Sequence, residues 1–180
     1  MKRLFALVLI MGSAALICRA GEPKGFTFQD IAYVHRWSKA NTHEFTPDEQ
    51  DDLDKFEDMI TVNGYPNVKD GDGLAEAANG VLENYKNAEA KILKTDSVPR
   101  TREHEAEHFI AAVFARPEFH EVAFARFKMV DGKGYSFVYS HRIYGKKAGD
   151  PMSAWLTDNG AEVEKALMEW TSMPSPAFSR

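Results

Sequence analysis

The sequence predicts one α+β domain in which N-terminal helices are followed by an antiparallel β-meander and by a C-terminal helix that covers the sheet. Apolar residues recur at helical spacing in the first half of the chain, aromatic and β-branched residues alternate around residues 121–144, and a helical pattern returns after residue 150. The chain contains no internal repeat and no linker. These observations favour a single domain over residues 21–172, followed by a flexible tail over residues 173–180.

The first 20 residues match the pattern of a cleaved signal peptide, which predicts a periplasmic or secreted protein. A positively charged start precedes an uncharged, apolar run of 14 residues from Leu4 to Ile17, which is too short to cross a bilayer comfortably. Small residues at Cys18 and Ala20 predict cleavage before Gly21. Lipidation of Cys18 is disfavoured because the residue before it is not small. The alternative, a buried N-terminal helix of the folded domain, is disfavoured because so apolar a run rarely belongs to a soluble fold.

Cleavage would remove three basic residues and no acidic one, which changes the net charge from −5 to −8. An acidic domain without a basic cluster binds nucleic acid and anionic lipid poorly. The single cysteine leaves with the signal peptide, so the mature chain has no disulfide and no thiol nucleophile. We therefore expect a protein or a small molecule as partner, no nucleic acid, and no membrane anchor after cleavage.

Two helices are predicted at the start of the mature chain. Thr27 has the position of an N-cap, which predicts a helix over residues 28–39. Residues 46–49, Thr-Pro-Asp-Glu, form a fuller start signal with a capping threonine and a proline at the first helical position. Apolar residues at helical spacing extend this second helix to Ile60. Its acidic residues indicate a solvated helix face rather than a metal or partner surface.

A third helix is predicted over residues 73–90, where apolar residues recur at intervals of three and four. Gly80 weakens this pattern without ending it. The preceding Asp70-Gly71-Asp72-Gly73 segment resembles a calcium loop, but Leu74 and Ala75 follow where further oxygen ligands are required. The segment is therefore predicted to be the turn that caps this helix.

A β-hairpin is predicted over residues 121–144. Two runs of alternating aromatic and β-branched residues are joined by Asp131-Gly132-Lys133-Gly134, which can supply the positive φ angles of a tight turn. Residues 108–114 have a similar length and composition and are a candidate for a third, neighbouring strand. Periodicity alone does not distinguish strand from helix in this segment.

The C-terminal helix begins at Asp150-Pro151, and an interruption is predicted at Asn159-Gly160 before the helical pattern continues to Trp170. The predicted order, with helices first, then a meander and then a closing helix, resembles the element order of PsbP-like sandwiches, in which helices cover an antiparallel sheet. This resemblance concerns architecture and implies no functional residue.

One motif carries chemical content. His104-Glu105-Ala106-Glu107-His108 matches the H-E-x-x-H pattern, in which two histidines one helical turn apart bind zinc and the glutamate, here Glu105, activates water. Charged neighbours and the missing third histidine of the longer motif argue against such a site. On a strand, His104 and His108 would be about 13 Å apart, too far for one ion. No spacing selects a third ligand among His120, Glu118, Glu121 and Glu162. We therefore expect no resident cofactor, with zinc as the alternative.

His141 is the second candidate for a functional side chain. On the strand over residues 135–144 it shares a face with Tyr135 and Tyr139. A histidine among aromatic residues can orient a bound ligand or act as a general base. The commoner arrangement is a half-buried histidine that is hydrogen-bonded inside the fold.

The sequence therefore supports an exported, non-catalytic binding or interaction protein. One alternative is a zinc-dependent hydrolase that uses His104, Glu105 and His108. Another is a small-ligand carrier with its pocket between the sheet and the helices. A large apolar cavity would favour the carrier, and a flat surface rich in Tyr and Trp would favour a protein-binding role.

Overall fold

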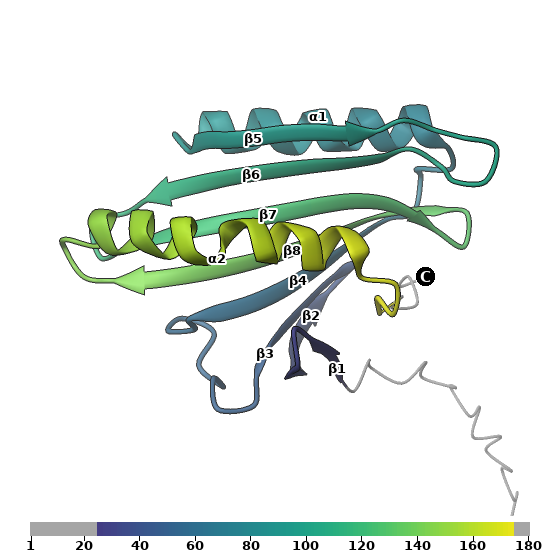
Figure 1. The fold of residues 1–180 in the computed structure, drawn as a ribbon. Helices are drawn as coiled ribbons and strands as arrows, with labels where there is room; N and C mark the ends of the chain where they lie inside the picture. Colours follow the sequence, from purple (N-terminus) through teal and green to yellow (C-terminus); the bar gives the residue numbers. More distant parts are fainter. Residues whose placement is uncertain (1–24, 175–180) are drawn as a thin grey trace, which may run out of the picture.

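A computed structural model describes residues 25–174. Within this range eight strands form one antiparallel sheet and two helices pack against it (Figure 1). The order of strands across the sheet is β1-β2-β3-β4-β8-β7-β6-β5. The strands are β1 (Gly25–Phe28), β2 (Ile31–Lys39), β3 (Thr42–Pro47), β4 (Asp58–Tyr65), β5 (Lys91–Val98), β6 (Glu107–Ala115), β7 (Phe119–Val130) and β8 (Lys133–Tyr144). The helices are α1 (Gly71–Asn87) and α2 (Gly149–Glu169). The predicted α+β class and the C-terminal helix are confirmed.

The two helices cover opposite faces of the sheet. In Figure 1, α2 passes in front of β7 and β8, and α1 lies behind β5. We call these the α2 face and the α1 face. Alternate residues of each strand point to alternate faces, so Phe109 packs in the core under α2 while Ile110 packs against Leu74 of α1. The sheet therefore has two separate cores and is buried on both sides where helices cover it.

The sheet curls around the end of α2. Trp170, which follows α2 directly, packs against Phe26 and Phe28 of β1 with ring centroids 5.0 and 5.1 Å apart. Burial of three large rings favours this curl, because apolar area removed from water stabilises the fold by about 25 cal/mol per Å². α1 packs mainly at the other end of the sheet, against β5, β6 and β7.

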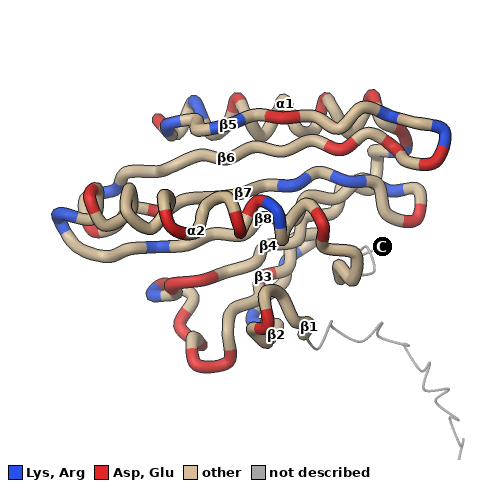
Figure 2. The backbone as a smooth tube through the Cα atoms, in the orientation of Figure 1, with Lys and Arg blue, Asp and Glu red and all other residues tan. Residues whose placement is uncertain are grey.

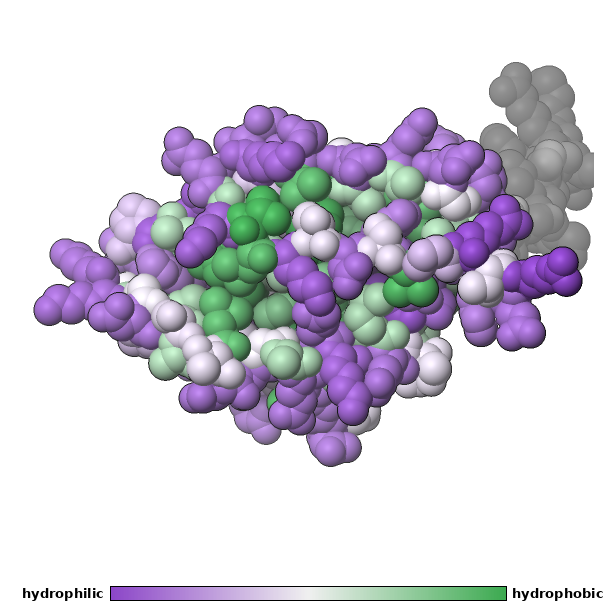
Figure 3. Space-filling view, turned by 45° about the horizontal axis from the view of Figure 1, so that its top comes forward, coloured by the Kyte–Doolittle hydropathy of each residue, from purple (hydrophilic) through white to green (hydrophobic). Residues whose placement is uncertain are grey.

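α2 meets the edge strand β5 through an ion pair. Lys94 Nζ lies 2.6 Å from a carboxylate oxygen of Glu164, above a groove of about 350 Å³ between β5 and α2. Both side chains are partly exposed, so solvent screens this pair and it contributes little to the stability of the fold. On the face seen in Figure 3, apolar side chains gather in the middle and hydrophilic side chains surround them.

The first predicted helix, over residues 28–39, is wrong. β1 and β2 form a hairpin there, and the turn residues Gln29 and Asp30 have φ angles of 47° and 62°. Thr27 pairs with Ala32 on β2 instead of capping a helix. The segment is rich in β-branched and aromatic side chains, which suit a pleated strand and here outweigh the capping signal.

The second predicted helix, from Thr46 to Ile60, is also wrong. The Thr46 hydroxyl accepts a hydrogen bond from Arg36 Nε at 3.0 Å and donates one to the backbone oxygen of Gln50. The hydroxyl thus closes a turn at the end of β3, and residues 48–57 form a loop before β4. Ser, Thr, Asn and Asp make such local bonds in turns as well as in helix caps, so the signal was real but ambiguous.

The third helix, the hairpin and the extra strand are confirmed. Asp70 is the N-cap of α1, and its side chain accepts a hydrogen bond from the Gly73 amide at 2.9 Å. β7 and β8 form the hairpin, whose turn holds only Asp131 and Gly132 at φ angles of 50° and 70°. This pair of positive φ angles matches the right-handed twist of the flanking strands. Residues 107–115 form β6, so the ambiguous segment is a strand.

The predicted interruption of the C-terminal helix is wrong. α2 runs for 21 residues without a break, and Gly160 is buried in its middle. A Cβ atom at this position would lie 3.6 Å from Leu156 and 3.9 Å from Phe124, which is ordinary van der Waals contact. Packing against the sheet therefore outweighs the weak helix propensity of glycine.

We expect Gly160→Ala and Gly80→Ala each to raise the free energy of unfolding by about 0.5–1 kcal/mol. Both glycines lie inside helices, and no heavy atom lies within 4 Å of a Cβ atom placed at Gly80. Alanine loses less backbone entropy on folding than glycine does. Urea unfolding of the two single variants measures the effect. A clear loss of stability in Gly80→Ala would contradict it.

Two predictions from the sequence fall mostly outside the described residues. The signal peptide, residues 1–20, lies there entirely, as does the end of the predicted tail. Met173, at the start of that tail, packs against the core under α2. Between residues 25 and 174, neither helix has the length and apolar character needed to cross a bilayer.

Candidate ligand-binding site

A row of hydrogen-bonded polar side chains lies on the α1 face of the sheet. Thr42 Oγ1 donates a hydrogen bond to Asn63 Oδ1 at 2.9 Å, and Asn63 Nδ2 donates one to Ser136 Oγ at 3.2 Å. The Tyr65 hydroxyl lies 3.1 Å from the same serine oxygen. These bonds connect β3, β4 and β8 side by side in the sheet. These hydrogen bonds form an ordered polar row across the three strands, with the buried Ser136 at its centre.

A cavity of about 470 Å³ opens on the same face, beside the loop of residues 48–57. Its size lies within the range typical of small-molecule sites. The lining combines aromatic, apolar and charged side chains and draws on β2, β3, β4, β7, β8 and the loop. The lining residues are Trp37, Glu44, Leu53, Asp54, Phe56, Met59, Thr61, Glu121, Ser140 and Arg142.

Trp37 lines the cavity because of a β-bulge in β2. The pairing with β3 shifts between His35 and Trp37, so Arg36 is an extra residue in this strand. His35 pairs with Phe45 on the α2 face, whereas Trp37 pairs with Glu44 on the α1 face. Bulges commonly redirect side chains near functional sites. The indole remains 41% exposed, which is unusual for a side chain of this size.

The extra residue of the bulge anchors the loop that forms one wall of the cavity. Arg36 donates hydrogen bonds to the backbone oxygens of Pro47 and Asp48 at 3.0 and 2.8 Å. Gln50 Oε1 accepts hydrogen bonds from the amides of Glu57 and Asp58 at 2.8 and 2.9 Å. Both ends of the loop are thus fixed to the sheet, which holds the wall in place before any ligand arrives.

Arg142 forms the floor of the cavity and is held from three sides. Its guanidinium lies between the rings of Phe56 and Phe119, 3.9 and 4.4 Å from their centroids. Its Nε donates a hydrogen bond to Glu121 at 2.7 Å. Burial opposes the charge, but the hydrogen bond and the negative charge of Glu121 hold the pKa of Arg142 above its usual value. The guanidinium is therefore a fixed charge whose nearest counter-ion is Glu121.

Glu44, unlike Arg142, is not held by hydrogen bonds or ion pairs with the described residues. Its side chain is partly buried. Burial raises the pKa of Glu44 because the carboxylate loses hydration, and the charge of Arg142 only partly opposes this effect. A carboxylate that lines a cavity and has no hydrogen-bond or ion-pair partner among the described residues can accept hydrogen bonds from a ligand.

We expect Glu44→Gln to stabilise the ligand-free protein at about pH 7 and to leave its stability unchanged at about pH 4. A pKa that is raised by folding means that the protonated form favours the folded state. The contribution of wild-type Glu44 is therefore fully present below the usual glutamate pKa and is lost as the pH rises through the raised value. Melting temperatures across this range measure the effect. A variant less stable than wild type at neutral pH would contradict it.

The histidine and tyrosine predicted as binding residues meet elsewhere, on the α2 face. Tyr139 donates a hydrogen bond to Asp58 at 2.5 Å, and His141 Nδ1 lies 2.9 Å from the same carboxylate oxygen. The ring of His141 stacks on Trp155 of α2 at 4.1 Å. Burial alone would raise the pKa of Asp58, but the hydrogen bonds from His141 and Tyr139 hold it below its usual value. Tyr135 lies apart from them, stacked on Phe137.

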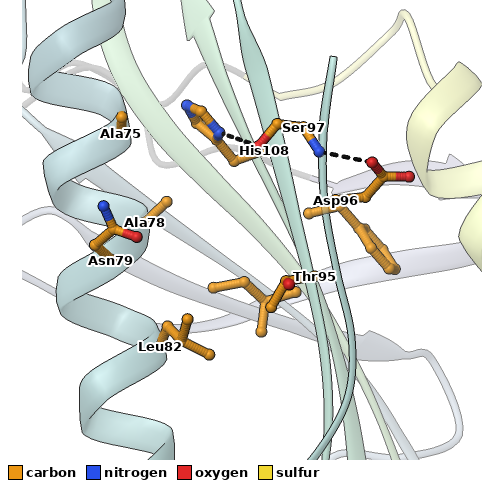
Figure 4. Close-up of a pocket in the computed structure, with 10 residues that line it drawn as sticks. Ala75, Ala78, Asn79, Leu82, Thr95, Asp96, Ser97 and His108 are labelled. Atoms are coloured by element: carbon orange, nitrogen blue, oxygen red, sulfur yellow. Dashed lines mark hydrogen bonds between the residues drawn. The ribbon is translucent and has the colours of Figure 1, made fainter. Parts of the chain in front are cut away.

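The helix that the zinc-hydrolase alternative requires is not present among the described residues. His104 and Glu105 lie in the exposed loop before β6, and Glu105 is 3.4 Å from Arg100. His108 lies on β6, where its Nδ1 is 2.9 Å from Ser97 Oγ of β5 (Figure 4). His120 pairs with Ala115 at the far end of the same strand pair, about 23 Å along the sheet from His108. The three residues of the motif are thus not brought into one site.

A second, smaller cavity of about 180 Å³ lies between α1 and the strands β5 and β6. His108, Ser97, Thr95 and Asn79 contribute its polar groups, as Figure 4 shows. Burial lowers the pKa of His108, so its ring is neutral near pH 7. Its Nε2 is buried and has no hydrogen-bond partner among the described residues. Residues 25–174 contain no group of three or more His, Cys, Asp or Glu side chains arranged to hold a metal ion.

The residues of the larger cavity were not identified from the sequence. Trp37 and Glu44 lie in or beside the segments predicted as helices, where their strand pairing could not be seen. Arg142 follows His141 directly on β8 and so lies on the opposite face, but its partner Glu121 is 21 residues away. The one available signal was the alternation of polar and apolar residues in β3 and β4.

Comparison with known proteins gives a family and distant structural likenesses. No curated protein matches the chain. Among the solved structures, human STARD10 is 9% identical, covers 77% of this chain and 74% of its own, and superposes with a TM-score of 0.29. One family model matches residues 20–171, which is most of the chain. The protein therefore belongs to the family that this model describes.

Proposed function

We propose that the mature chain is an exported, non-catalytic protein that binds a small polar ligand in the cavity between Trp37 and Arg142. The observation that carries this proposal is the convergence of an exposed indole, an unpartnered carboxylate and a fixed guanidinium around about 470 Å³ of open space. Binding sites combine apolar walls with a few placed polar groups in this way. The cavity is neither a large apolar pocket nor a flat aromatic surface.

The cavity is built before a ligand arrives. The bonds of Arg36 and Gln50 hold the loop wall, and the rings around Arg142 hold the floor. Binding to such a site has little ordering cost, so a small contact area can give useful affinity. The cavity lining includes no histidine and no cysteine. His141 projects to the other face of the sheet, where its ring stacks on Trp155.

A thermal-shift screen of small polar compounds against the mature chain tests this proposal. We expect at least one compound to raise the melting temperature of wild type and not that of Trp37→Ala, because the indole forms part of the cavity wall. Ile31→Ala is the matched control, since it shortens a similarly exposed apolar side chain outside the cavity. Equal shifts in wild type and Trp37→Ala, or no shift with any compound, would contradict the proposal.

The export part of the proposal has its own test. Mass spectrometry of protein from the native host should give an N-terminus near Gly21. Recovery of the chain from the cytoplasm with Met1 intact would contradict export and would leave the binding proposal unaffected.

A further inference from the structure

We infer that the ligand of this cavity carries an ammonium group, which binds between the indole of Trp37 and the carboxylate of Glu44. This inference rests on the proposed function and names the chemical class of the ligand. It follows from the placement of these two side chains, from the charge around the cavity and from the way in which Arg142 is held.

Trp37 and Glu44 are direct cross-strand partners of β2 and β3, and both line the cavity. Directly opposed residues on one face of an antiparallel pair have Cβ atoms about 4.5–5.5 Å apart. An aromatic face attracts a cation within about 6 Å of its centroid, and Trp is the strongest of the aromatic side chains in this respect. One ammonium group can therefore contact the indole and the carboxylate together.

The charge around the cavity favours a cation. Three carboxylates and one guanidinium line it, and Glu121 is already paired with Arg142. The carboxylates of Glu44 and Asp54 make no ion pair with the described residues. Figure 2 shows further acidic residues along the loop of residues 48–57, which holds six acidic residues and one lysine. An anionic ligand would meet this negative potential, whereas a cation would be attracted by it.

Among residues 25–174, the protein does not supply the missing cation. Arg142 is the only basic side chain in the lining, and Glu121, Phe56 and Phe119 hold its guanidinium in place. Partly buried carboxylates usually have a partner, because a buried charge without one is costly. Burial raises the pKa of Glu44, which indicates that this cost is present in the ligand-free protein. An ammonium ligand would remove that cost, which adds to its affinity.

The experiment compares cations with a neutral molecule of the same shape. Isothermal titration calorimetry of the mature chain would use methylammonium, tetramethylammonium, choline and spermidine, with 3,3-dimethyl-1-butanol as the uncharged counterpart of choline. We expect at least one cation to bind, and choline to bind at least 10-fold more tightly than its neutral counterpart. Higher salt should weaken the binding, because the carboxylates are open to solvent.

Two variants test whether the carboxylate of Glu44 is the charge that binds the cation. Glu44→Gln should weaken cation binding at least 10-fold while keeping the fold, which its melting temperature reports. Glu76→Gln, the same change at an exposed glutamate of α1, should leave the affinity unchanged. Binding by none of the four cations, equal binding of the neutral alcohol, or full affinity in Glu44→Gln would each overturn the inference. A compound from the thermal-shift screen that depends on Trp37 would in that case still support the proposed function.

Discussion

Replacing Arg126 with methionine is expected to lower the free energy of unfolding by about 3 kcal/mol. Arg126 lies on β7, is 3% exposed, and its Nε donates a hydrogen bond to Glu107 at 2.6 Å. Its NH1 group donates to the backbone oxygens of Leu167 and Trp170 at the end of α2, at 2.8 and 3.0 Å. One side chain thus satisfies carbonyl groups that a helix end leaves without partners. We expect a loss of stability at the lower end of the range that is usual for breaking a buried ion pair, because Lys128 Nζ also lies 3.0 Å from Glu107.

Urea unfolding followed by circular dichroism measures this loss. Lys128→Met is the control, because its partly exposed ammonium should contribute less than about 1 kcal/mol. Adding Glu107→Gln to Arg126→Met should recover part of the stability, since it removes the carboxylate that was left without its main partner. A loss of less than about 1 kcal/mol in Arg126→Met would contradict the role that the structure gives to this residue.

The same pair predicts a dependence on pH. Burial alone would raise the pKa of Glu107, but the hydrogen bonds and charges of Arg126 and Lys128 hold it below its usual value. A lowered pKa in the folded state contributes stability above the usual glutamate pKa, and this contribution is lost as the pH falls through the lowered value. The difference between wild type and Arg126→Met should therefore shrink in acid.

The parts of the fold that could be predicted depend on contacts close in sequence. The hairpin of β7 and β8 needs only alternating side chains and a turn that tolerates positive φ, and Asp131-Gly132 supplies that turn. α1 needs a stripe of apolar residues and a cap, which Asp70 provides. Each of these elements is specified within about 25 residues, so periodicity and turn chemistry were sufficient.

The errors arose where one local signal fits two structures. Thr46 stands in the sequence context of a capping residue, but its hydroxyl donates a hydrogen bond to the backbone oxygen of Gln50 and accepts one from Arg36 on another strand, which closes a turn. Gly160 reads as a helix breaker, but packing against the sheet keeps α2 continuous. In both cases a partner on another element decides the outcome, Arg36 of β2 for Thr46 and Phe124 of the sheet for Gly160, and the local pattern does not show that partner.

The cavity could not be predicted from the sequence either, because its lining depends on how several strands and a loop come together. Its lining comes from five strands and one loop, and the position of Trp37 depends on a single extra residue in β2. A shift of one residue moves every side chain of a strand to the other face. The predicted binding residues His141 and Tyr139 do share a face, as expected, but they meet at Asp58 on β4, which had been assigned to a helix.

Replacing Gly134 with alanine is expected to lower the free energy of unfolding by about 1–3 kcal/mol. A Cβ atom at this position would lie 2.6 Å from Val68 Cγ1 and 2.8 Å from Val68 Cβ, and the Gly134 amide donates a hydrogen bond to the Val68 oxygen at 3.2 Å. Valine is stiff at χ1, so it cannot turn away from the new methyl group. The clash would separate the hairpin from the segment that leads into α1.

Gly132→Ala is the matched control for this prediction. Its φ of +70° strains any alanine, but no heavy atom lies within 4 Å of the added Cβ, so its cost of about 1 kcal/mol should be independent of Val68. Val68→Ala removes the nearest methyl group and leaves the Cβ atom at 2.8 Å. It should therefore recover part of the loss in Gly134→Ala and none of the loss in Gly132→Ala. Urea unfolding of the three single variants and the two double variants, together with wild type, completes both double-mutant cycles. Strict additivity of Gly134→Ala and Val68→Ala would show that the close contact at Val68 is not what excludes a side chain from position 134.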